Sequence, residues 1–202
     1  MTDLPLAERR ALLDAPAWPF DGMNEHGLAV GMAAVPESQM PYDADQKTIG
    51  SLTVIREMLD HARDVDEALA ILQSHNISWS GGPPLHYLVA DRSGRSILVE
   101  FYEGRLVVLD NQAPWHVATN FLRAAAGESP QGRCRRYDEI SQRLTQAQGR
   151  ITPQAALELL ADVSQGNTQW SVVYEMSTGD VRAALGRGYA DVHTLHLDLA
   201  GE

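Results

Sequence analysis

The sequence predicts an α+β fold in which helices cover stacked antiparallel sheets. Residues 52–72 hold two helix-length segments whose apolar side chains recur every three to four positions. From residue 85 the apolar positions follow strand spacing, and short glycine-containing turns separate the segments. Helical spacing returns over 135–163, and a second antiparallel block closes the chain. Because helices and strands come in separate blocks, the pattern indicates α+β with the sheets stacked and the helices outside.

Composition narrows the class of protein. The 202 residues are 44% hydrophobic, which favours a single domain over residues 1–202. A net charge of −11 argues against a nucleic-acid partner, because a phosphate-binding surface needs excess Lys and Arg. No apolar run reaches the ~18 residues needed to span a bilayer, so we expect no membrane partner and a soluble, cytoplasmic protein.

The first half of the chain begins with a lead-in over residues 1–20, in which 4–15 has helical spacing and Pro5 suits a first turn. A glycine-bearing turn then runs into an apolar strand within 20–35, followed by a polar loop. A helix is predicted over 52–62. A second helix follows at once, because Asp64 and Glu67 have capping-box spacing.

The second half is predicted in the same way. Strands over 85–91, 96–102 and 105–110 are apolar on both faces, so both faces should be covered. The segment "WHVATNF" resembles a further strand, and "RRYDEISQRLTQA" is helical. Thr152 and Pro153 cap another helix. Strands within 168–176, 181–185 and 193–199 end the chain.

Three polar features could carry chemistry, and spacing alone leaves each of them open. The turn "GMNEHG" is either a hairpin in which Gly22, Asn24 and Gly27 accept positive φ, or a platform of hydrogen-bond donors. Asn120 closes an apolar segment, where it either caps a turn or donates to an oxyanion. Arg135 and Arg136 either lie on a solvated helix face or present a planar fork to a substrate carbonyl or carboxylate.

The cysteine and the histidines of the chain are weaker candidates for a functional site. Cys134 is the single cysteine, so neither an intrachain disulfide nor a thiolate metal cluster is expected. Neighbouring arginines would favour its thiolate, but a cysteine at a helix start with basic surface neighbours is the preferred interpretation. His193 and His196 should point to opposite faces of a strand, and no glycine-rich phosphate loop is found. We therefore expect no metal and no cofactor.

Several segments jointly resemble one family. "DGMNEHGLAV" is similar to the D-G-(I/M)-N-E-K-G-L signature of the linear-amide C–N hydrolases of the N-terminal-nucleophile superfamily, which include choloylglycine hydrolases, penicillin V acylases and acyl-CoA:6-aminopenicillanate acyltransferases. The blocks "RDVDEALAIL", "HYLVADRSGRSILVEF", "HVATNF", "RRYDEI" and "TQWSVVYEMSTGDV" follow in family order, over about residues 12–185. The resemblance is greatest to the acyltransferase-like branch. It implies a four-layer αββα sandwich whose partner is a small-molecule amide or acyl substrate.

The resemblance also implies a site. Asn24 matches the signature asparagine associated with the oxyanion hole, Asn120 matches the T-N asparagine that contacts the intermediate, and Arg136 matches the arginine of the R-(Y/F) block. Arg135 competes with Arg136, because Arg133 stands where the family often has serine. In such enzymes an N-terminal cysteine supplies both nucleophile and general base, and water or an amine resolves the acyl-enzyme.

The chain departs from the family at its start. About twenty residues precede the signature, and they contain no cysteine, so an N-terminally truncated sandwich is expected. Thr2 is a weak alternative nucleophile, since "DLPLAERR" does not resemble a buried strand. Three hypotheses follow: a fragment of an amidase or acyltransferase, a non-catalytic ligand-binding or assembly module, and a chain complemented by another polypeptide. Unpaired sheet edges would favour a homo-oligomer or a complementing chain.

Overall fold

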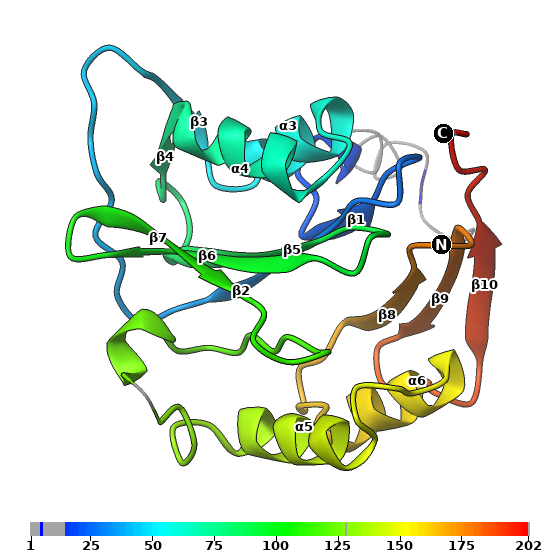
Figure 1. The fold of residues 1–202 in the computed structure, drawn as a ribbon. Helices are drawn as coiled ribbons and strands as arrows, with labels where there is room; N and C mark the ends of the chain where they lie inside the picture. Colours follow the sequence, from blue (N-terminus) through cyan, green and yellow to red (C-terminus); the bar gives the residue numbers. More distant parts are fainter. Residues whose placement is uncertain (1–4, 6–14, 128, 202) are drawn as a thin grey trace.

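The computed structural model describes residues 5, 15–127 and 129–201. Its helices and sheets are stacked in four layers (Figure 1). A helical layer covers a five-stranded sheet, and a three-stranded sheet follows with a second helical layer. This confirms the predicted αββα sandwich. The helix predicted over 4–15 lies outside the described residues, apart from Pro5 and Ala15. Ala15–Ala17 forms the short 3₁₀ turn η1.

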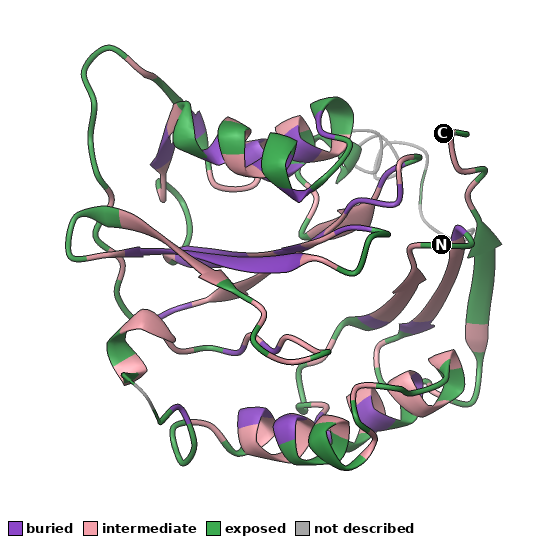
Figure 2. Cartoon of the chain, viewed as in Figure 1, coloured by how far each residue is buried: buried purple, intermediate pink, exposed green. Residues whose placement is uncertain are grey.

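The larger sheet has the strand order β1-β2-β5-β6-β7 and is antiparallel throughout. Its strands are β1 (Asp21–Met23), β2 (Ala29–Ala34), β5 (Leu85–Ala90), β6 (Ser96–Tyr102) and β7 (Arg105–Asp110). The central strands β5 and β6 are buried on both faces, as their continuous apolar runs predict (Figure 2).

Helices α3 (Thr53–His61) and α4 (Val65–Gln73) cover one face of this sheet. The core lies between them and the alternate side chains of the strands, which include Tyr87, Val99 and Phe101. The start of α4 has the predicted cap, because Asp64 Oδ1 accepts from the Glu67 amide at 2.9 Å. The Glu67 carboxylate in turn accepts from the Arg63 amide at 2.8 Å.

One strand pair was not predicted. β3 (Lys47–Gly50) and β4 (His75–Ser78) form a separate parallel two-stranded sheet. Each strand has four residues and a single isoleucine, and Ile49 lies opposite Ile77. Strands this short and polar lack the alternation that identifies a strand in sequence.

The second half of the sandwich consists of α5 (Arg135–Gln146), α6 (Pro153–Asp162) and the sheet β10-β9-β8. Its strands are β8 (Trp170–Glu175), β9 (Asp180–Leu185) and β10 (Val192–His196), all antiparallel. The predicted cap of α6 is present, since Thr152 Oγ1 accepts from the Ala155 amide at 3.1 Å.

Asp21 joins the two sheets. Its carboxylate in β1 accepts from Trp170 Nε1 at 2.7 Å and from the Tyr174 hydroxyl at 2.5 Å, both in β8. Burial, then the nearby Asp21 carboxylate, raises the pKa of Tyr174, so this hydroxyl stays protonated as a donor. Phe20 also meets the Trp170 ring edge-on, with 5.8 Å between centroids.

The segment "WHVATNF" is not a strand, which corrects the prediction. Residues 115–119 form no ladder, and the 3₁₀ turn η2 (Ala124–Ala126) follows. The backbone is held by side chains of other segments instead, as described below. Among the described residues, no helix combines the length and apolarity that crossing a membrane requires.

Candidate functional site

Asn24 occupies the β1–β2 turn, where it is 6% exposed. Its Nδ2 donates to the carbonyl oxygens of Leu59 at 3.1 Å and Ala62 at 2.7 Å, at the end of α3. Its Oδ1 accepts from the amides of His26 at 3.0 Å and Leu28 at 3.1 Å. Carbonyls at a helix end lack intrahelical partners, so Asn24 satisfies two of them. With both amide hydrogens donated, the expected oxyanion role of Asn24 is not supported by this geometry.

Gly27 completes the turn and explains the second glycine of the motif. It has φ +73°, whereas neither Gly22 nor Asn24 has the positive φ that was expected. A Cβ at Gly27 would lie 2.4 Å from the Met176 carbonyl oxygen, just beyond β8. The motif from Asp21 to Leu28 is therefore a junction that joins the larger sheet to α3 and to the smaller sheet.

Asn120 and Arg136, which the resemblance assigns to the site separately, are hydrogen-bonded to each other. Arg136, in the first turn of α5, donates from a terminal guanidinium nitrogen to Asn120 Oδ1 at 2.6 Å. Asn120 Nδ2 donates one hydrogen to the Ala34 carbonyl oxygen, at the end of β2, at 2.8 Å. The amide has two hydrogens, so the second has no partner among the described residues. The pair thus offers an unused amide donor beside a guanidinium.

The two neighbouring arginines have different partners. Arg135 is exposed on the outer side of α5, where its guanidinium lies 3.6 Å from the Glu139 carboxylate. Consecutive helical residues point about 100° apart, so only one of the two can reach Asn120. That one is Arg136.

A buried polar cluster supports this corner. His86 Nδ1 and Glu100 Oε1 lie 2.8 Å apart, and both side chains are fully buried. The Glu100 carboxylate also accepts from the amides of Arg123 at 2.8 Å and Ala124 at 2.7 Å. Arg123 then donates to the Tyr137 hydroxyl at 2.5 Å. This chain of bonds anchors the loop carrying Asn120 to β6, and anchors that loop to the helical turn carrying Arg136.

This cluster was not predicted, although the sequence contains a signal for it. Glu100 interrupts the apolar run of β6, where a carboxylate is costly unless it is bonded. His86 and Glu100 extend the antiparallel register that places Tyr87 opposite Val99. A histidine and a glutamate at facing positions of two apolar strands are the sequence signal that indicates such a buried pair.

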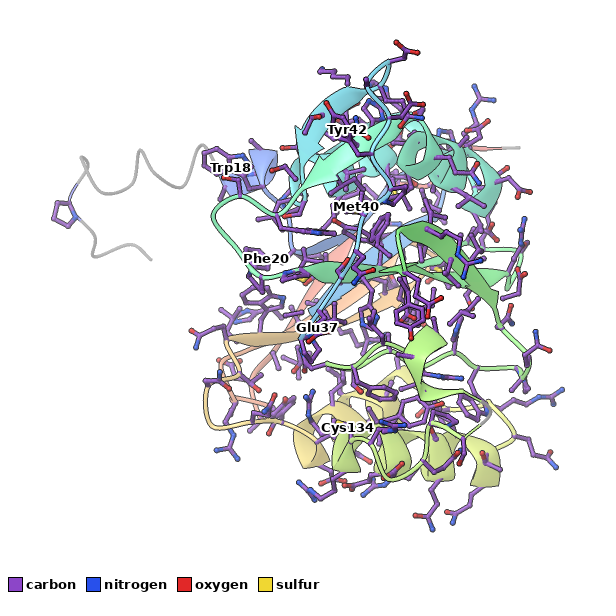
Figure 3. The ribbon with its side chains drawn as sticks, turned by 90° about the vertical axis from the view of Figure 1, so that its left-hand side faces the viewer. Trp18, Phe20, Glu37, Met40, Tyr42 and Cys134 are labelled. Atoms are coloured by element: carbon purple, nitrogen blue, oxygen red, sulfur yellow. The ribbon has the colours of Figure 1, made fainter. Side chains whose placement is uncertain are left out.

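Two pockets lie next to these residues. An apolar pocket of about 540 Å³ is lined by Trp18, Phe20, Met32, Ala34, Leu52 and Leu85, among others. Ala34 lies in its lining, and the carbonyl oxygen of Ala34 accepts from Asn120 Nδ2. A smaller hollow of about 190 Å³ has Glu37, Phe121 and Arg133 in its lining. Figure 3 labels Glu37 and, below it in that view, Cys134 at the start of α5. Among the described residues, no group of three or more His, Cys, Asp and Glu could hold a metal ion.

Comparisons with known proteins agree with this architecture. Residues 11–123, more than half of the chain, match the family of linear amide C–N hydrolases, choloylglycine hydrolase family. An uncharacterized protein, A284L, of Paramecium bursaria Chlorella virus 1 is 34% identical over 111 residues, which cover 50% of this chain and 39% of the viral protein. The chain therefore matches well under half of that relative's length.

Two solved structures share the fold at low identity. A variant of conjugated bile acid hydrolase from Clostridium perfringens superposes with a TM-score of 0.66 at 16% identity, covering 88% of this chain and 72% of the hydrolase. Penicillin V acylase from Agrobacterium tumefaciens also gives a TM-score of 0.66, at 21% identity, covering 92% of this chain and 69% of the acylase. Taken with the family match, these findings show that the chain belongs to the linear amide C–N hydrolases of the choloylglycine hydrolase family.

Proposed function

We propose that this protein binds a linear amide with an apolar acyl group and transfers that acyl group, to water or to an amine, at the corner formed by Asn120 and Arg136. The observation that carries the proposal is the 2.6 Å bond from Arg136 to Asn120 Oδ1. It holds the amide in the orientation that leaves a hydrogen of Nδ2 free for a carbonyl oxygen. Such a donor stabilises the oxyanion of a tetrahedral intermediate.

The apolar pocket supports an acyl group of this kind. Its walls are the aromatic rings of Trp18 and Phe20 and the aliphatic side chains of Met32, Leu52 and Leu85. Burying hydrocarbon there is favourable by about 25 cal/mol per Å². Because Ala34 lines the pocket and its carbonyl oxygen accepts from Asn120 Nδ2, we expect an acyl chain in the pocket to direct its carbonyl group towards the second hydrogen of that amide.

A second candidate function is binding without turnover. The pocket of about 540 Å³ is large enough for a small apolar ligand whether or not a nucleophile acts beside it. The protein would then be a ligand-binding member of the same fold. Turnover separates the two candidates.

The test uses N-hexanoylglycine, a linear amide with an apolar acyl chain. Release of hexanoic acid is followed by mass spectrometry, and binding by the fluorescence of Trp18 with Trp18→Phe as a reference. We expect Asn120→Ala and Arg136→Ala each to lower release by about 10²-fold or more. Arg135→Ala is the matched control and should leave release unchanged.

The outcomes are distinct. Binding without release, in the parent chain, supports the second candidate and overturns the first. Release that survives both Asn120→Ala and Arg136→Ala also overturns the assigned corner. If the chain neither binds nor hydrolyses amides of several acyl lengths, both candidate functions are refuted.

A further inference from the structure

A charged pocket of about 450 Å³ is formed by residues that belong neither to the corner of Asn120 and Arg136 nor to the lining of the apolar pocket. Four segments form its wall: the β1–β2 turn, the junction of α3 and α4, the β5–β6 turn and the end of the described chain. Three arginines, Arg63, Arg92 and Arg95, line it together with three aspartates. Which kind of ligand fits therefore depends on which of these charges are already paired.

The backbone fixes where two of the arginine side chains begin. Arg63 stands between α3 and α4, and its amide donates to the Glu67 carboxylate at 2.8 Å. Arg92 starts close to the β1–β2 turn, because a Cβ on Gly27 would lie 3.4 Å from Arg92 Cβ. The end of the chain is held beside the same turn, since the Ala200 amide donates to a carbonyl oxygen there at 2.7 Å (Figure 1). Side chains from separate segments are thus brought to one cavity.

The aspartates of this pocket already have partners inside the protein. Asp64 caps α4, as described above. Asp91 is 5% exposed, and its carboxylate accepts from the first amide of α4 at 3.0 Å and from the amide and the hydroxyl of Ser93 at 2.9 and 2.5 Å. Asp66 lies 2.6 Å from the guanidinium of Arg95, so these two charges neutralise each other. The carboxylates of the pocket therefore serve the fold.

The other two arginines keep most of their hydrogen-bond donors. Among the described residues, the guanidinium of Arg63 has no hydrogen-bond or ion-pair partner, and that of Arg92 has a single long contact, 3.5 Å to the Ala200 carbonyl oxygen. Each guanidinium has five N–H donors in one plane and no acceptor. The unused capacity of the pocket consists of donors, which an anion with several acceptor oxygens satisfies.

We propose that this pocket binds the phosphate group of a small molecule between Arg63 and Arg92. A planar guanidinium matches two phosphate oxygens at once. Two unpaired arginines also balance the charge of about −1.5 to −2 that a phosphate monoester carries at pH 7. The volume of about 450 Å³ exceeds that of a phosphate group, so the rest of the molecule has room in the same cavity.

The proposed site uses side chains in place of the glycine-rich loop that the sequence lacks. The net charge of −11 repels anions in general, so affinity for phosphate must come from local contacts. A phosphate between Arg63 and Arg92 would tie the α3–α4 junction to the β5–β6 turn, and a ligand that binds only the folded chain stabilises it. The inference is independent of the proposed acyl transfer.

The first measurement uses inorganic phosphate as the probe. Binding to the chain is followed by isothermal titration calorimetry at constant ionic strength, with chloride as the balancing anion, and thermal unfolding is recorded in parallel. We expect saturable binding with a Kd of about 1 mM or tighter, and an unfolding midpoint that rises with phosphate concentration. Binding that does not saturate by about 20 mM phosphate would overturn the inference.

Arginine variants locate the site. We expect Arg63→Ala and Arg92→Ala each to weaken phosphate binding by about tenfold or more, and Arg92→Lys to weaken it less, because lysine keeps the charge but not the planar fork. Arg105→Ala is the matched control, since Arg105 pairs with Glu103 on the surface, and it should leave the Kd unchanged. Circular dichroism checks the fold of each variant. Equal Kd values for the parent chain, Arg63→Ala and Arg92→Ala would refute the assignment.

Two further probes identify the chemistry of the ligand. Glucose 6-phosphate should bind at least as tightly as inorganic phosphate if the site serves a phosphorylated small molecule, and about tenfold more weakly if it serves the free anion. Acetate should bind at least about tenfold more weakly than either, because it has one charge and two oxygens. Acetate binding as tight as that of phosphate would overturn a phosphate site. None of these measurements involves release of hexanoic acid, so this inference and the proposed function fail separately.

Discussion

His86 Nδ1 and Glu100 Oε1 lie 2.8 Å apart on neighbouring strands, and solvent reaches neither side chain. The second nitrogen of His86, Nε2, has no partner among the described residues. Glu100 meanwhile accepts two backbone amides from the loop that carries Asn120. A buried carboxylate with three donors is an anchor whose removal leaves all three unsatisfied.

We therefore predict that Glu100→Ala lowers the free energy of unfolding by about 3–5 kcal/mol, because it leaves buried His86 and two loop amides without their hydrogen-bond partner. Urea unfolding followed by circular dichroism measures this. Glu103→Ala is the matched control, since Glu103 pairs with Arg105 at the surface, and it should cost under ~1 kcal/mol. Equal costs for the two variants would show that Glu100 anchors nothing.

The double-mutant cycle of His86→Asn and Glu100→Gln sharpens this prediction. Directly bonded buried residues are expected to couple by about 0.5–3 kcal/mol. If the two single effects simply add, the 2.8 Å contact contributes nothing to stability.

Asn24→Ala should destabilise the fold more than it affects any chemistry. The substitution leaves two helix-end carbonyls and the amides of His26 and Leu28 without their partners. We expect a loss of about 2–4 kcal/mol in the free energy of unfolding, measured in urea. Asn120→Ala, at an exposed position, should cost well under half of that.

If Asn24 is instead an oxyanion donor, the opposite effects on stability and on turnover are expected. An oxyanion donor would leave the urea midpoint of Asn24→Ala unchanged and lower the release of hexanoic acid. Observing that pattern would restore the role that the resemblance implies.

His116 should make stability depend on pH. Burial, followed by the charge of Arg123, lowers the pKa of His116 in the folded chain. The unfolded chain, with a histidine pKa of about 6.5, then takes up its proton first as pH falls. The neutral histidine contributes stability above that pH, and the contribution is lost as pH falls below it.

The measurement is a series of urea midpoints between about pH 5 and pH 8, across the histidine range. His116→Gln should flatten the curve on its acid side, whereas His61→Gln, at an exposed helix position, should not. Identical curves for the parent chain and His116→Gln would refute the prediction.

Much of the fold could be predicted because its signals are local. The spacing of apolar residues in α3, α4 and α5, the caps at Asp64 and Thr152, and the turns that separate β5, β6 and β7 all lie within short segments. The pairing of β3 with β4 could not be predicted, since it joins two four-residue polar strands across a helix pair. Nor could the irregular path of residues 115–119, whose apolar spacing is that of a strand although no ladder forms.

The candidate site divides in the same way. The amino-acid sequence by itself determined the order of the layers, the hairpin turn around Asn24 and the presence of Asn120 and Arg136 in family order. Only the tertiary structure decided what each side chain does. The Asn24 side chain donates to carbonyl oxygens at the end of α3. Arg136, and not Arg135, donates to Asn120. Glu100 accepts from amides of a loop more than twenty residues away in the sequence. The physical reason is that a hydrogen bond satisfies an amide only when a distant partner lies within about 3 Å, and periodicity within a segment does not specify that partner.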